Sequence, residues 1–192
     1  MLKRNKESVD NKFFLVCLLA FFICVVIDLV TKGLAEFFIE EHEVIKFIPW
    51  FMNLTLEYNS GMAFSWLSDN PLAMDIITWL TVPVMIALLV GAYWLPKQYN
   101  PHRFLLCVVA GGAFGNFVDR ILIAEGVRDF MDISSIGFGV CNFADYFITI
   151  GGVCLLFCLL FVGEDAVLPL IGKKKNSVEE QATDKTEEDA ES

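Results

Sequence analysis

Residues 13–32 read FFLVCLLAFFICVVIDLVTK. The run from Phe13 to Ile27 contains no Asp, Glu, Lys or Arg, and Asp28 and Lys32 follow within the next five residues. A helix that crosses the hydrocarbon core of a bilayer needs about 20 mainly apolar residues, so this stretch reaches full length only by including both charges. A charge at membrane depth is costly and by default marks a functional site. The stretch therefore predicts a membrane-spanning helix with functional residues near one end.

Three more apolar stretches follow the same pattern. The ranges 76–95, 104–118 and 146–163 contain no acidic or basic residue. The range 104–118 is short for a span unless it runs on through Asp119 and Arg120. Hydrophobic residues make up 56% of the chain and Phe occurs 18 times, which is more than a soluble globular domain usually carries. We predict an α-helical membrane protein with four transmembrane helices.

The basic residues predict how these spans are oriented. They lie before the first span, beside the connection between the second and third, and after the fourth (Lys3, Arg4, Lys6, Lys12, Lys97, Arg103 and Lys173 to Lys175). The segment 33–75 instead carries seven acidic residues and one lysine. Because Lys and Arg are enriched in cytoplasmic loops, we predict that both termini are cytoplasmic. The charges at the ends of the spans then converge on the opposite face of the membrane.

We expect residues 1–171 to form one membrane domain, with an outer segment over about residues 33–71, and residues 172–192 to form a disordered acidic tail. From residue 176 onward the chain has seven carboxylates and one lysine, a composition that cannot bury a core. Much of the net charge of −10 is therefore local. The lysines at 173–175 suit the anionic inner leaflet, and nothing in the sequence supports nucleic-acid binding.

The outer segment mixes two patterns. Residues 36–43 are acidic and helix-like, whereas residues 47–58 are rich in aromatic and branched side chains and predict one or two strands resting on the membrane surface. The following run, Asn59-Ser-Gly-Met-Ala-Phe64, places an amide and the flexible Gly61 just after a strand. Taken alone, this run is typical of an ordinary turn.

Small residues followed by polar ones occupy the end of the third span. The small residues form a face that lets a neighbouring helix approach closely (Gly111, Gly112, Ala113 and Gly115), and Asn116, Asp119 and Arg120 follow. Asp119 and Arg120 could equally be an interfacial ion pair that anchors the helix end. Asp28 and Lys32 are four residues apart, a spacing that suits mutual pairing on one helix face.

Asp129 and Asp145 are the strongest candidates for chemistry. Two carboxylates brought together at an apolar boundary cannot both ionise easily, so one keeps its proton near neutral pH. Such a pair could hydrolyse a peptide bond, because the charged carboxylate activates water and the neutral one hydrogen-bonds the carbonyl. The alternative is ion or proton translocation. A conductive path needs polar residues through the whole bilayer, yet the inner halves of the spans are almost wholly apolar, which favours a site facing the surface.

Five motifs together resemble the lipoprotein signal peptidases, also called signal peptidase II. They occur in the family's order and extend from the first span to the fourth: Asp28-Leu-Val-Thr-Lys32, Asn59-Ser-Gly-Met-Ala-Phe64, Gly111-Gly-Ala-Phe-Gly-Asn116 with Phe-Val-Asp119-Arg120, Val127-Arg-Asp129-Phe130, and Asn142-Phe-Ala-Asp145. Each motif alone is weak, but the set is highly specific. The chain departs from the family at Cys141, where members often have an aromatic residue, and in its acidic tail.

The resemblance implies a four-span aspartyl protease of the bacterial inner membrane with a small periplasmic β-cradle. Its substrates would be prolipoproteins that already carry diacylglycerol on a cysteine, reached through the membrane lipids, and globomycin-type lipopeptides would inhibit it. No metal or organic cofactor is implied. Carried over by motif, Asp129 and Asp145 would be the catalytic dyad, and the remaining motif residues would bind substrate or support the site (Asp28, Lys32, Asn59, Gly61, Asn116, Asp119, Arg120 and Asn142).

Overall fold

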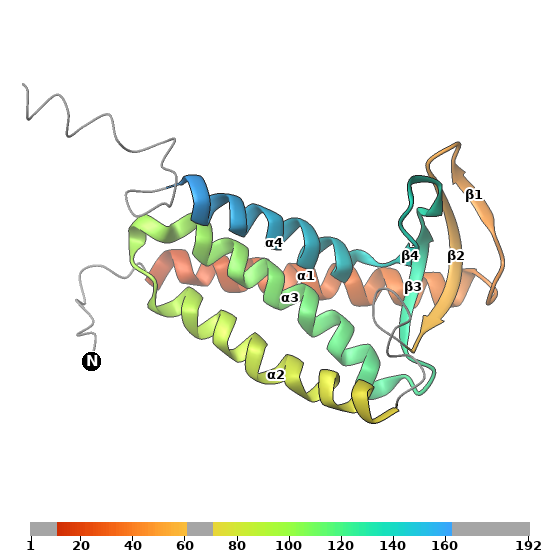
Figure 1. The fold of residues 1–192 in the computed structure, drawn as a ribbon, viewed down its shortest axis with the longest axis horizontal. Coiled ribbons are helices and arrows are strands. Elements are labelled where there is room, and N and C mark those ends of the chain that lie inside the picture. Colours follow the sequence, from red (N-terminus) through yellow and green to blue (C-terminus); the bar gives the residue numbers. More distant parts are fainter. Residues whose placement is uncertain (1–10, 61–70, 163–192) are drawn as a thin grey trace, which may run out of the picture.

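The computed structural model describes residues 11–60 and 71–162. Within these ranges the chain forms four long helices and a small sheet at one end of them (Figure 1). The helices are α1 (Asn11–Phe38), α2 (Pro71–Trp94), α3 (Asn100–Leu122) and α4 (Phe143–Phe161). Each is long and apolar enough to cross a membrane, which confirms the predicted helical membrane fold.

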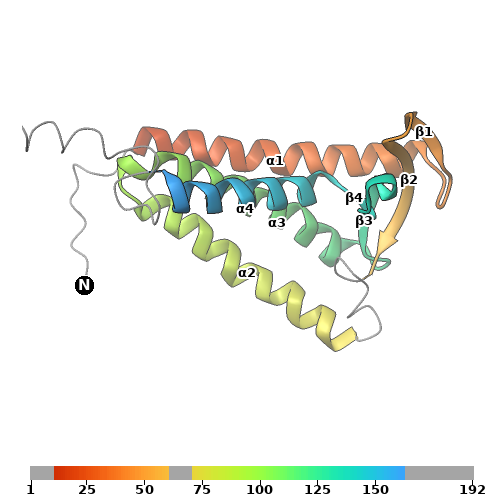
Figure 2. The same cartoon turned by 45° about the horizontal axis from the view of Figure 1, so that its top comes forward.

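Helix α3 is the centre of the bundle, since it packs against α1, α2 and α4 (Figures 1 and 2). Two of its glycines explain the close approach. A Cβ atom on Gly112 would lie 2.6 Å from the backbone oxygen of Ala144 in α4, and one on Gly115 would collide with the Asp28 carboxylate in α1. The predicted small-residue face therefore serves two neighbours, and it holds them where the polar residues of all three helices can meet.

The four strands form one antiparallel sheet in the order β1 (Ile45–Ile48), β2 (Met52–Asn59), β3 (Val127–Asp132) and β4 (Val140–Cys141). The first two pair as a hairpin in the region where the sequence predicted one or two strands, residues 47–58. The pairing of β2 with β3 joins segments far apart in the sequence and sets Tyr58 opposite Arg128 and Asn59 opposite Val127. The sheet lies at the end of the bundle opposite the α2–α3 connection (Figure 1).

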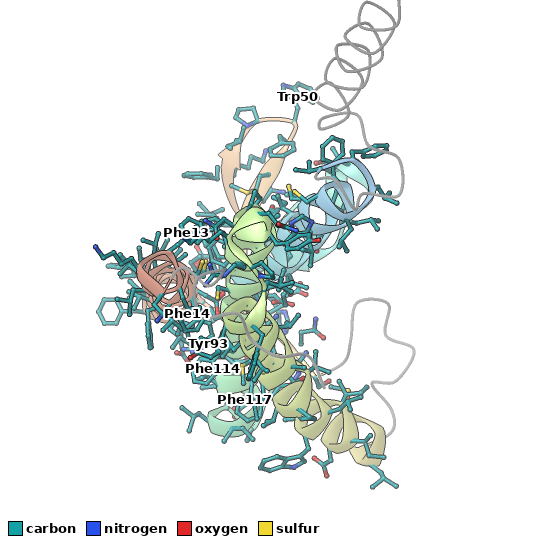
Figure 3. The ribbon with its side chains drawn as sticks, turned by 90° about the vertical axis from the view of Figure 1, so that its left-hand side faces the viewer. Phe13, Phe14, Trp50, Tyr93, Phe114 and Phe117 are labelled. Atoms are coloured by element: carbon teal, nitrogen blue, oxygen red, sulfur yellow. The ribbon has the colours of Figure 1, made fainter. Side chains whose placement is uncertain are left out.

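Two apolar clusters hold these parts together. One lies inside the bundle (Cys17, Phe21, Val25, Met85, Ala92, Cys107 and Ala110), and the other lies under the sheet (Ala35, Ile39, Leu56, Phe130 and Met131). The aromatic rings of Phe14 and Tyr93 meet edge to face between α1 and α2 at a centroid distance of 5.2 Å. Figure 3 shows them beside the bundle axis, whereas Trp50 projects from the hairpin and is 97% exposed.

The outer surfaces of the helices carry large apolar side chains that no part of the described chain covers, among them Leu19, Phe22, Trp79 and Phe157. Such extended exposed apolar surface is unusual for a soluble protein. It fits helices whose outer faces contact lipid, as the four candidate spans require.

Candidate active site

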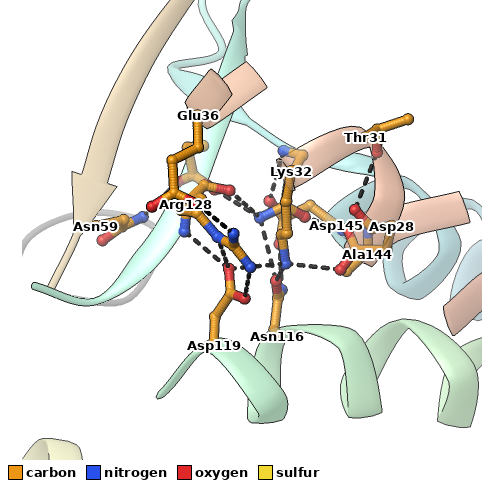
Figure 4. A network of polar contacts seen from close by, with 12 residues as sticks. Asp28, Thr31, Lys32, Glu36, Asn59, Asn116, Asp119, Arg128, Ala144 and Asp145 are labelled. Carbon is orange, nitrogen blue, oxygen red and sulfur yellow. Dashed lines mark hydrogen bonds and ion pairs between the residues drawn. The ribbon is translucent and has the colours of Figure 1, made fainter. Parts of the chain in front are cut away.

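Nine of the ten predicted site residues lie at the sheet end of the bundle, and hydrogen bonds or ion pairs join eight of them into one network (Figure 4). They come from five elements: Asp28 and Lys32 from α1, Asn59 from β2, Asn116, Asp119 and Arg120 from α3, Asp129 from β3, and Asn142 and Asp145 from the start of α4. The tenth, Gly61, lies outside the described residues.

The start of α4 orients Asp145. Asn142 is the N-cap residue, and its side-chain oxygen accepts a hydrogen bond from the Asp145 backbone N–H at 3.0 Å. The Asp145 side chain in turn bonds the backbone of Asn142, since its Oδ2 accepts from the Asn142 backbone N–H at 3.1 Å. This reciprocal capping box satisfies two backbone N–H groups that the helix leaves unpaired. The local motif Asn-x-x-Asp thus fixes the direction of the Asp145 carboxylate.

The Asn142 side chain also reaches the second aspartate. Its Nδ2 donates to Asp129 Oδ1 at 2.6 Å and lies 3.3 Å from the Arg128 backbone oxygen. Asn142 is fully buried, so these bonds are shielded from water. One residue therefore contacts both aspartates, Asp145 through its backbone amide and Asp129 through its side-chain amide.

Asn116 supplies a second bridge. Its Nδ2 donates to Asp145 Oδ1 at 2.8 Å, and its Oδ1 accepts from Lys32 Nζ at 2.8 Å and from Asn142 Nδ2 at 3.1 Å. Each of these contacts runs from a donor to an acceptor. Asp145 is thus held on both carboxylate oxygens.

Asp129 sits in a more apolar position. Its side chain is 3% exposed, and its Oδ2 accepts a hydrogen bond from Asn59 Nδ2 at 2.9 Å. Burial, together with the negative charge of Asp145, raises the pKa of Asp129 to about 7, against the opposing effect of the Asn59 and Asn142 hydrogen bonds. A carboxyl with this pKa can hold or release a proton near neutral pH.

A buried ion network lies beneath the two aspartates. The Lys32 ammonium is 2.7 Å from Asp28 and 3.5 Å from Asp119, and all three side chains are fully buried. Asp119 in turn binds the Arg128 guanidinium in a two-pronged contact, with Nη2 donating to Oδ1 at 2.6 Å. Two cations and two anions balance one another here, which is the condition under which charges are tolerated in a protein interior.

This network also fixes the backbone. Asp28 Oδ1 accepts from the Ala144 N–H at 2.8 Å, and Asp119 Oδ2 accepts from the Arg128 N–H at 3.0 Å. The first contact ties the start of α4 to α1, and the second ties β3 to α3. Each of these segments carries one of the two aspartates, so the buried ion network holds the backbone next to both of them in place.

The sequence left open an interfacial ion pair between Asp119 and Arg120. In the structure, the ion-pair partners of Asp119 are other residues. Asp119 is occupied by Lys32 and Arg128. The Arg120 Nε is buried and has no hydrogen-bond partner among the described residues, while its charge acts on Asp145, Asp129 and Asp119. A half-buried guanidinium with an unused donor beside two carboxylates can bind a further acceptor.

Two residues that contact this network, Glu36 and Tyr58, were not identified from the sequence, and Arg128, which lies in the Val127-Arg-Asp129-Phe130 motif, was given no role in the site. Arg128 Nη1 donates to Glu36 Oε2 at 2.7 Å, and the Tyr58 hydroxyl donates to Glu36 Oε1 at 3.1 Å. A signal for Glu36 was present, since it continues the four-residue spacing of Asp28 and Lys32 on one face of α1. Within the part of the chain that the structure describes, no three His, Cys, Asp or Glu side chains are grouped to hold a metal ion.

Comparison with known proteins gives a consistent result. Residues 20–161 match the profile of a family described as signal peptidase (SPase) II. The chain is 39% identical over 165 residues to a lipoprotein signal peptidase of Pelagibacter ubique, covering 82% of this chain and 93% of that protein. Relatives with the same name include those of Hydrogenovibrio crunogenus (38% identical, 82% and 90% covered) and Treponema denticola (34% identical, 80% and 89% covered).

Two solved structures are similar in fold. One is a bacterial membrane enzyme determined by the in meso method at 2.3 Å, with a TM-score of 0.69 and 29% identity, covering 80% of this chain and 90% of that one. The other, determined in the same way at 1.9 Å, has a TM-score of 0.67 and 26% identity, covering 80% and 96%.

Proposed function

Because the chain belongs to the signal peptidase (SPase) II family, we propose that it is a membrane aspartyl endopeptidase that removes the signal peptide from diacylglyceryl-modified prolipoproteins. It cuts on the N-terminal side of the lipidated cysteine, and Asp129 and Asp145 are its catalytic dyad. One observation carries the dyad: Asn142 donates to both carboxylates, through its side chain to Asp129 and through its backbone to Asp145.

The dyad hydrolyses the peptide bond by exchanging protons with water and substrate. Ionised Asp145 takes a proton from a water molecule as the water oxygen attacks the carbonyl carbon, and protonated Asp129 gives its proton to the carbonyl oxygen. The resulting diol collapses when Asp145 returns its proton to the departing amine and Asp129 recovers one from a diol hydroxyl. The carbon–nitrogen bond breaks, and both aspartates regain their starting states.

Their surroundings support this division of roles. Asp129 is buried and has a pKa raised to about 7, so it keeps a proton below that pH. Asp145 lies in the first turn of α4 and accepts two hydrogen bonds. The first turn of a helix carries a partial positive charge that attracts a carboxylate. The burial of Asp129 therefore makes it the proton-bearing member of the pair, and Asp145 is positioned to accept a proton from water.

The other residues bind substrate or hold the dyad. Arg120, with its unused buried donor, binds a backbone carbonyl of the signal peptide. Asn59 positions Asp129, and Asn116 positions Asp145. Asp28, Lys32 and Asp119 form the buried ionic support. Gly61, which follows β2 in the sequence, allows the substrate backbone to approach.

The substrate reaches the site by lateral diffusion in the membrane. We propose that the enzyme lies in the bacterial inner membrane, that residues 1–171 form the peptidase domain, and that both termini, including the tail at 172–192, are cytoplasmic. The dyad then faces the periplasmic surface, where an exported lipid-anchored peptide arrives. A globomycin-type lipopeptide, which combines an acyl chain with a peptide, would compete for this pocket.

The alternative, a small ion or proton transporter, is less well supported. Between the dyad and the opposite end of the bundle lies the apolar cluster of Cys17, Phe21, Met85, Cys107 and their neighbours. A conducting path would have to pass through this cluster, where the described side chains provide no relay of carboxylates.

The experiment that tests the proposal is cleavage of a purified diacylglyceryl prolipoprotein by the wild type, Asp129→Asn and Asp145→Asn. An amide can neither activate water nor exchange a proton, so each substitution should lower kcat at least about 10²-fold while the protein stays folded and membrane-inserted. Asp132→Asn is the matched control, because Asp132 lies on the same strand as Asp129 but bonds Ser134 and Asn53. It should retain turnover, and substantial cleavage by either dyad variant would reject the assignment.

A further inference from the structure

We propose that Glu36 is a positioning residue that aligns Asn59 with Asp129 by clamping strands β2 and β3 to helix α1. Glu36 and its partner Tyr58 lie outside the motifs that suggested the family, whereas its other partner, Arg128, lies within the Val127-Arg-Asp129-Phe130 motif. The inference rests on the proposed function, since it assigns Glu36 a part in holding one member of the dyad.

The clamp consists of one carboxylate with one donor from each strand. Glu36 Oε1 accepts from the Tyr58 hydroxyl of β2 at 3.1 Å, and Glu36 Oε2 accepts from Arg128 Nη1 of β3 at 2.7 Å. The Arg128 side chain is 12% exposed and the Glu36 side chain is 41% exposed. Glu36 therefore lies at the edge of the site and reaches inward to both strands.

The register of the sheet carries the effect of this clamp to the dyad. Tyr58 of β2 lies opposite Arg128 of β3. The next residue along β2 is Asn59, and the next along β3 is Asp129. Successive side chains of a strand point to opposite faces. The pair gripped by Glu36 therefore lies on one face of the sheet, and the Asn59–Asp129 hydrogen bond of 2.9 Å lies on the other.

This part of the sheet needs an anchor. The pairing of β2 and β3 shifts register between Leu54 and Glu57, and only the pairs at 57, 58 and 59 follow before β2 ends. A short ladder beyond a bulge and at a strand end is weakly constrained by backbone hydrogen bonds alone. Glu36 adds a contact to each strand within this ladder.

Arg128 is held in place by several contacts besides the one with Glu36. Its guanidinium also binds Asp119, its N–H donates to Asp119, and its C=O lies near Asn142. Within the described residues, the Tyr58 side chain hydrogen-bonds only Glu36, and its ring packs against the apolar cluster under the sheet. Loss of Glu36 should therefore release β2 with Asn59 from β3, rather than move β3 itself.

A change in the Asn59–Asp129 contact has a measurable signature. That hydrogen bond lowers the pKa of Asp129 against burial and against Asp145, and Lys32, Arg120 and Cys141 are the other ionisable groups that act on this carboxyl. When Asn59 moves away, the pKa of Asp129 rises. Since protonated Asp129 is the acid of the reaction, the alkaline limb of kcat/KM moves to higher pH.

The test compares graded variants in the cleavage assay. Glu36→Ala removes both contacts, whereas Glu36→Gln and Tyr58→Phe remove one each. We expect kcat to fall about five-fold for the single losses and about 20-fold for Glu36→Ala, with KM within about two-fold of the wild type, because small misplacement of a catalytic group costs turnover. The control is Glu40→Gln, which changes an exposed carboxylate just beyond α1 and should leave kcat unchanged.

The pH profile separates positioning from simple loss of structure. All three Glu36 and Tyr58 variants should shift the alkaline limb upward, and adding Glu36→Ala to Asn59→Ala should cause no further shift. A lower amount of folded enzyme would reduce the rate at every pH without moving the limb. If Glu36→Ala keeps the wild-type kcat and pH profile while Asp129→Asn is inactive, the clamp is wrong and the dyad stands. If Asp129→Asn is active, the dyad assignment itself is wrong.

Discussion

The Lys32 ammonium donates to the side-chain oxygen of Asn116 over 2.8 Å. Because an ammonium group can only donate, this bond determines which end of the Asn116 amide faces α1. The amide nitrogen is then turned to Asp145, which it reaches at 2.8 Å. Lys32 thus acts on the proposed dyad through the orientation of a neutral side chain, although it also neutralises Asp28 and Asp119.

Replacing Lys32 by Met should therefore damage both stability and activity. The substitution leaves Asp28 and Asp119 buried with one cation fewer, and breaking a buried ion pair in this way costs about 3–5 kcal/mol. It also frees the Asn116 amide to rotate. Thermal unfolding in detergent micelles should show a lower midpoint, and the folded fraction should cleave slowly. Lys46→Met, on the exposed strand β1, is the control, and a wild-type midpoint and rate in Lys32→Met would contradict the role of the network.

The pKa of Asp129 predicts the alkaline limit of activity. Burial and the Asp145 charge raise this pKa to about 7, so the protonated form that the mechanism requires is present below that pH and is lost as the pH rises through it. The plot of kcat/KM against pH should fall with a midpoint near 7 on its alkaline side. An alkaline limb with its midpoint two or more units away, measured with a substrate that does not itself titrate, would show that another group supplies the proton.

The raised pKa of Asp129 also predicts how stability depends on pH. The folded protein holds a proton on Asp129 at pH values where the unfolded chain has released it, so the folded state binds more protons. Stability then decreases as the pH rises from the ordinary range of a carboxyl to about 7. Asp129→Asn lacks this group, and its unfolding midpoint should fall less than that of the wild type between pH 5 and pH 8. Equal pH dependence of the two proteins would contradict the burial argument.

The spans and their common polar end could be predicted because they depend on local properties. Length without charge identifies a span, and the alternation of span direction brings Asp28, Asp119 and Asp145 to one end of the bundle. One or two strands over residues 47–58 were equally visible as a run of branched and aromatic side chains, although their pairing as a hairpin was not. None of these conclusions requires knowledge of which atoms touch.

The strand β3 could not be predicted in this way. Its sequence, Val-Arg-Asp-Phe-Met-Asp, combines the strand-favouring Val and Phe with two aspartates, which are depleted in strands, and its charges would suit a loop. It becomes a strand because β2 pairs with one edge and Asp119 and Asn142 bond its backbone. For the same reason the partner of Asp119 was not evident: Arg120 is adjacent in sequence, but β3 brings Arg128 to it.

The distribution of basic residues predicts the topology. A reporter fused at Asn100, the first residue of α3 after the α2–α3 connection, or after Lys175 should be active in the cytoplasm, and one fused near Asn70 should be active in the periplasm. The structure locates the α2–α3 connection and the sheet at opposite ends of the bundle (Figure 1). The reversed pattern would put the dyad on the cytoplasmic side, where an exported substrate cannot reach it, and would reject the peptidase proposal.

The last prediction concerns the lipid on the substrate. A prolipoprotein that lacks diacylglycerol should be cleaved with a kcat/KM at least about 10²-fold lower than the same chain after lipidation, because the acyl chains concentrate the substrate in the membrane and set the scissile bond beside Asp129 and Asp145. A globomycin-type lipopeptide should inhibit cleavage of the lipidated form competitively. The same preparation in liposomes, loaded with a pH-sensitive dye, tests the transporter alternative. Asp129→Asn serves as the control in both assays, since either activity would depend on that carboxylate. If the wild type moves protons or cations but leaves lipidated substrate intact, the protein is a transporter and the peptidase proposal is wrong.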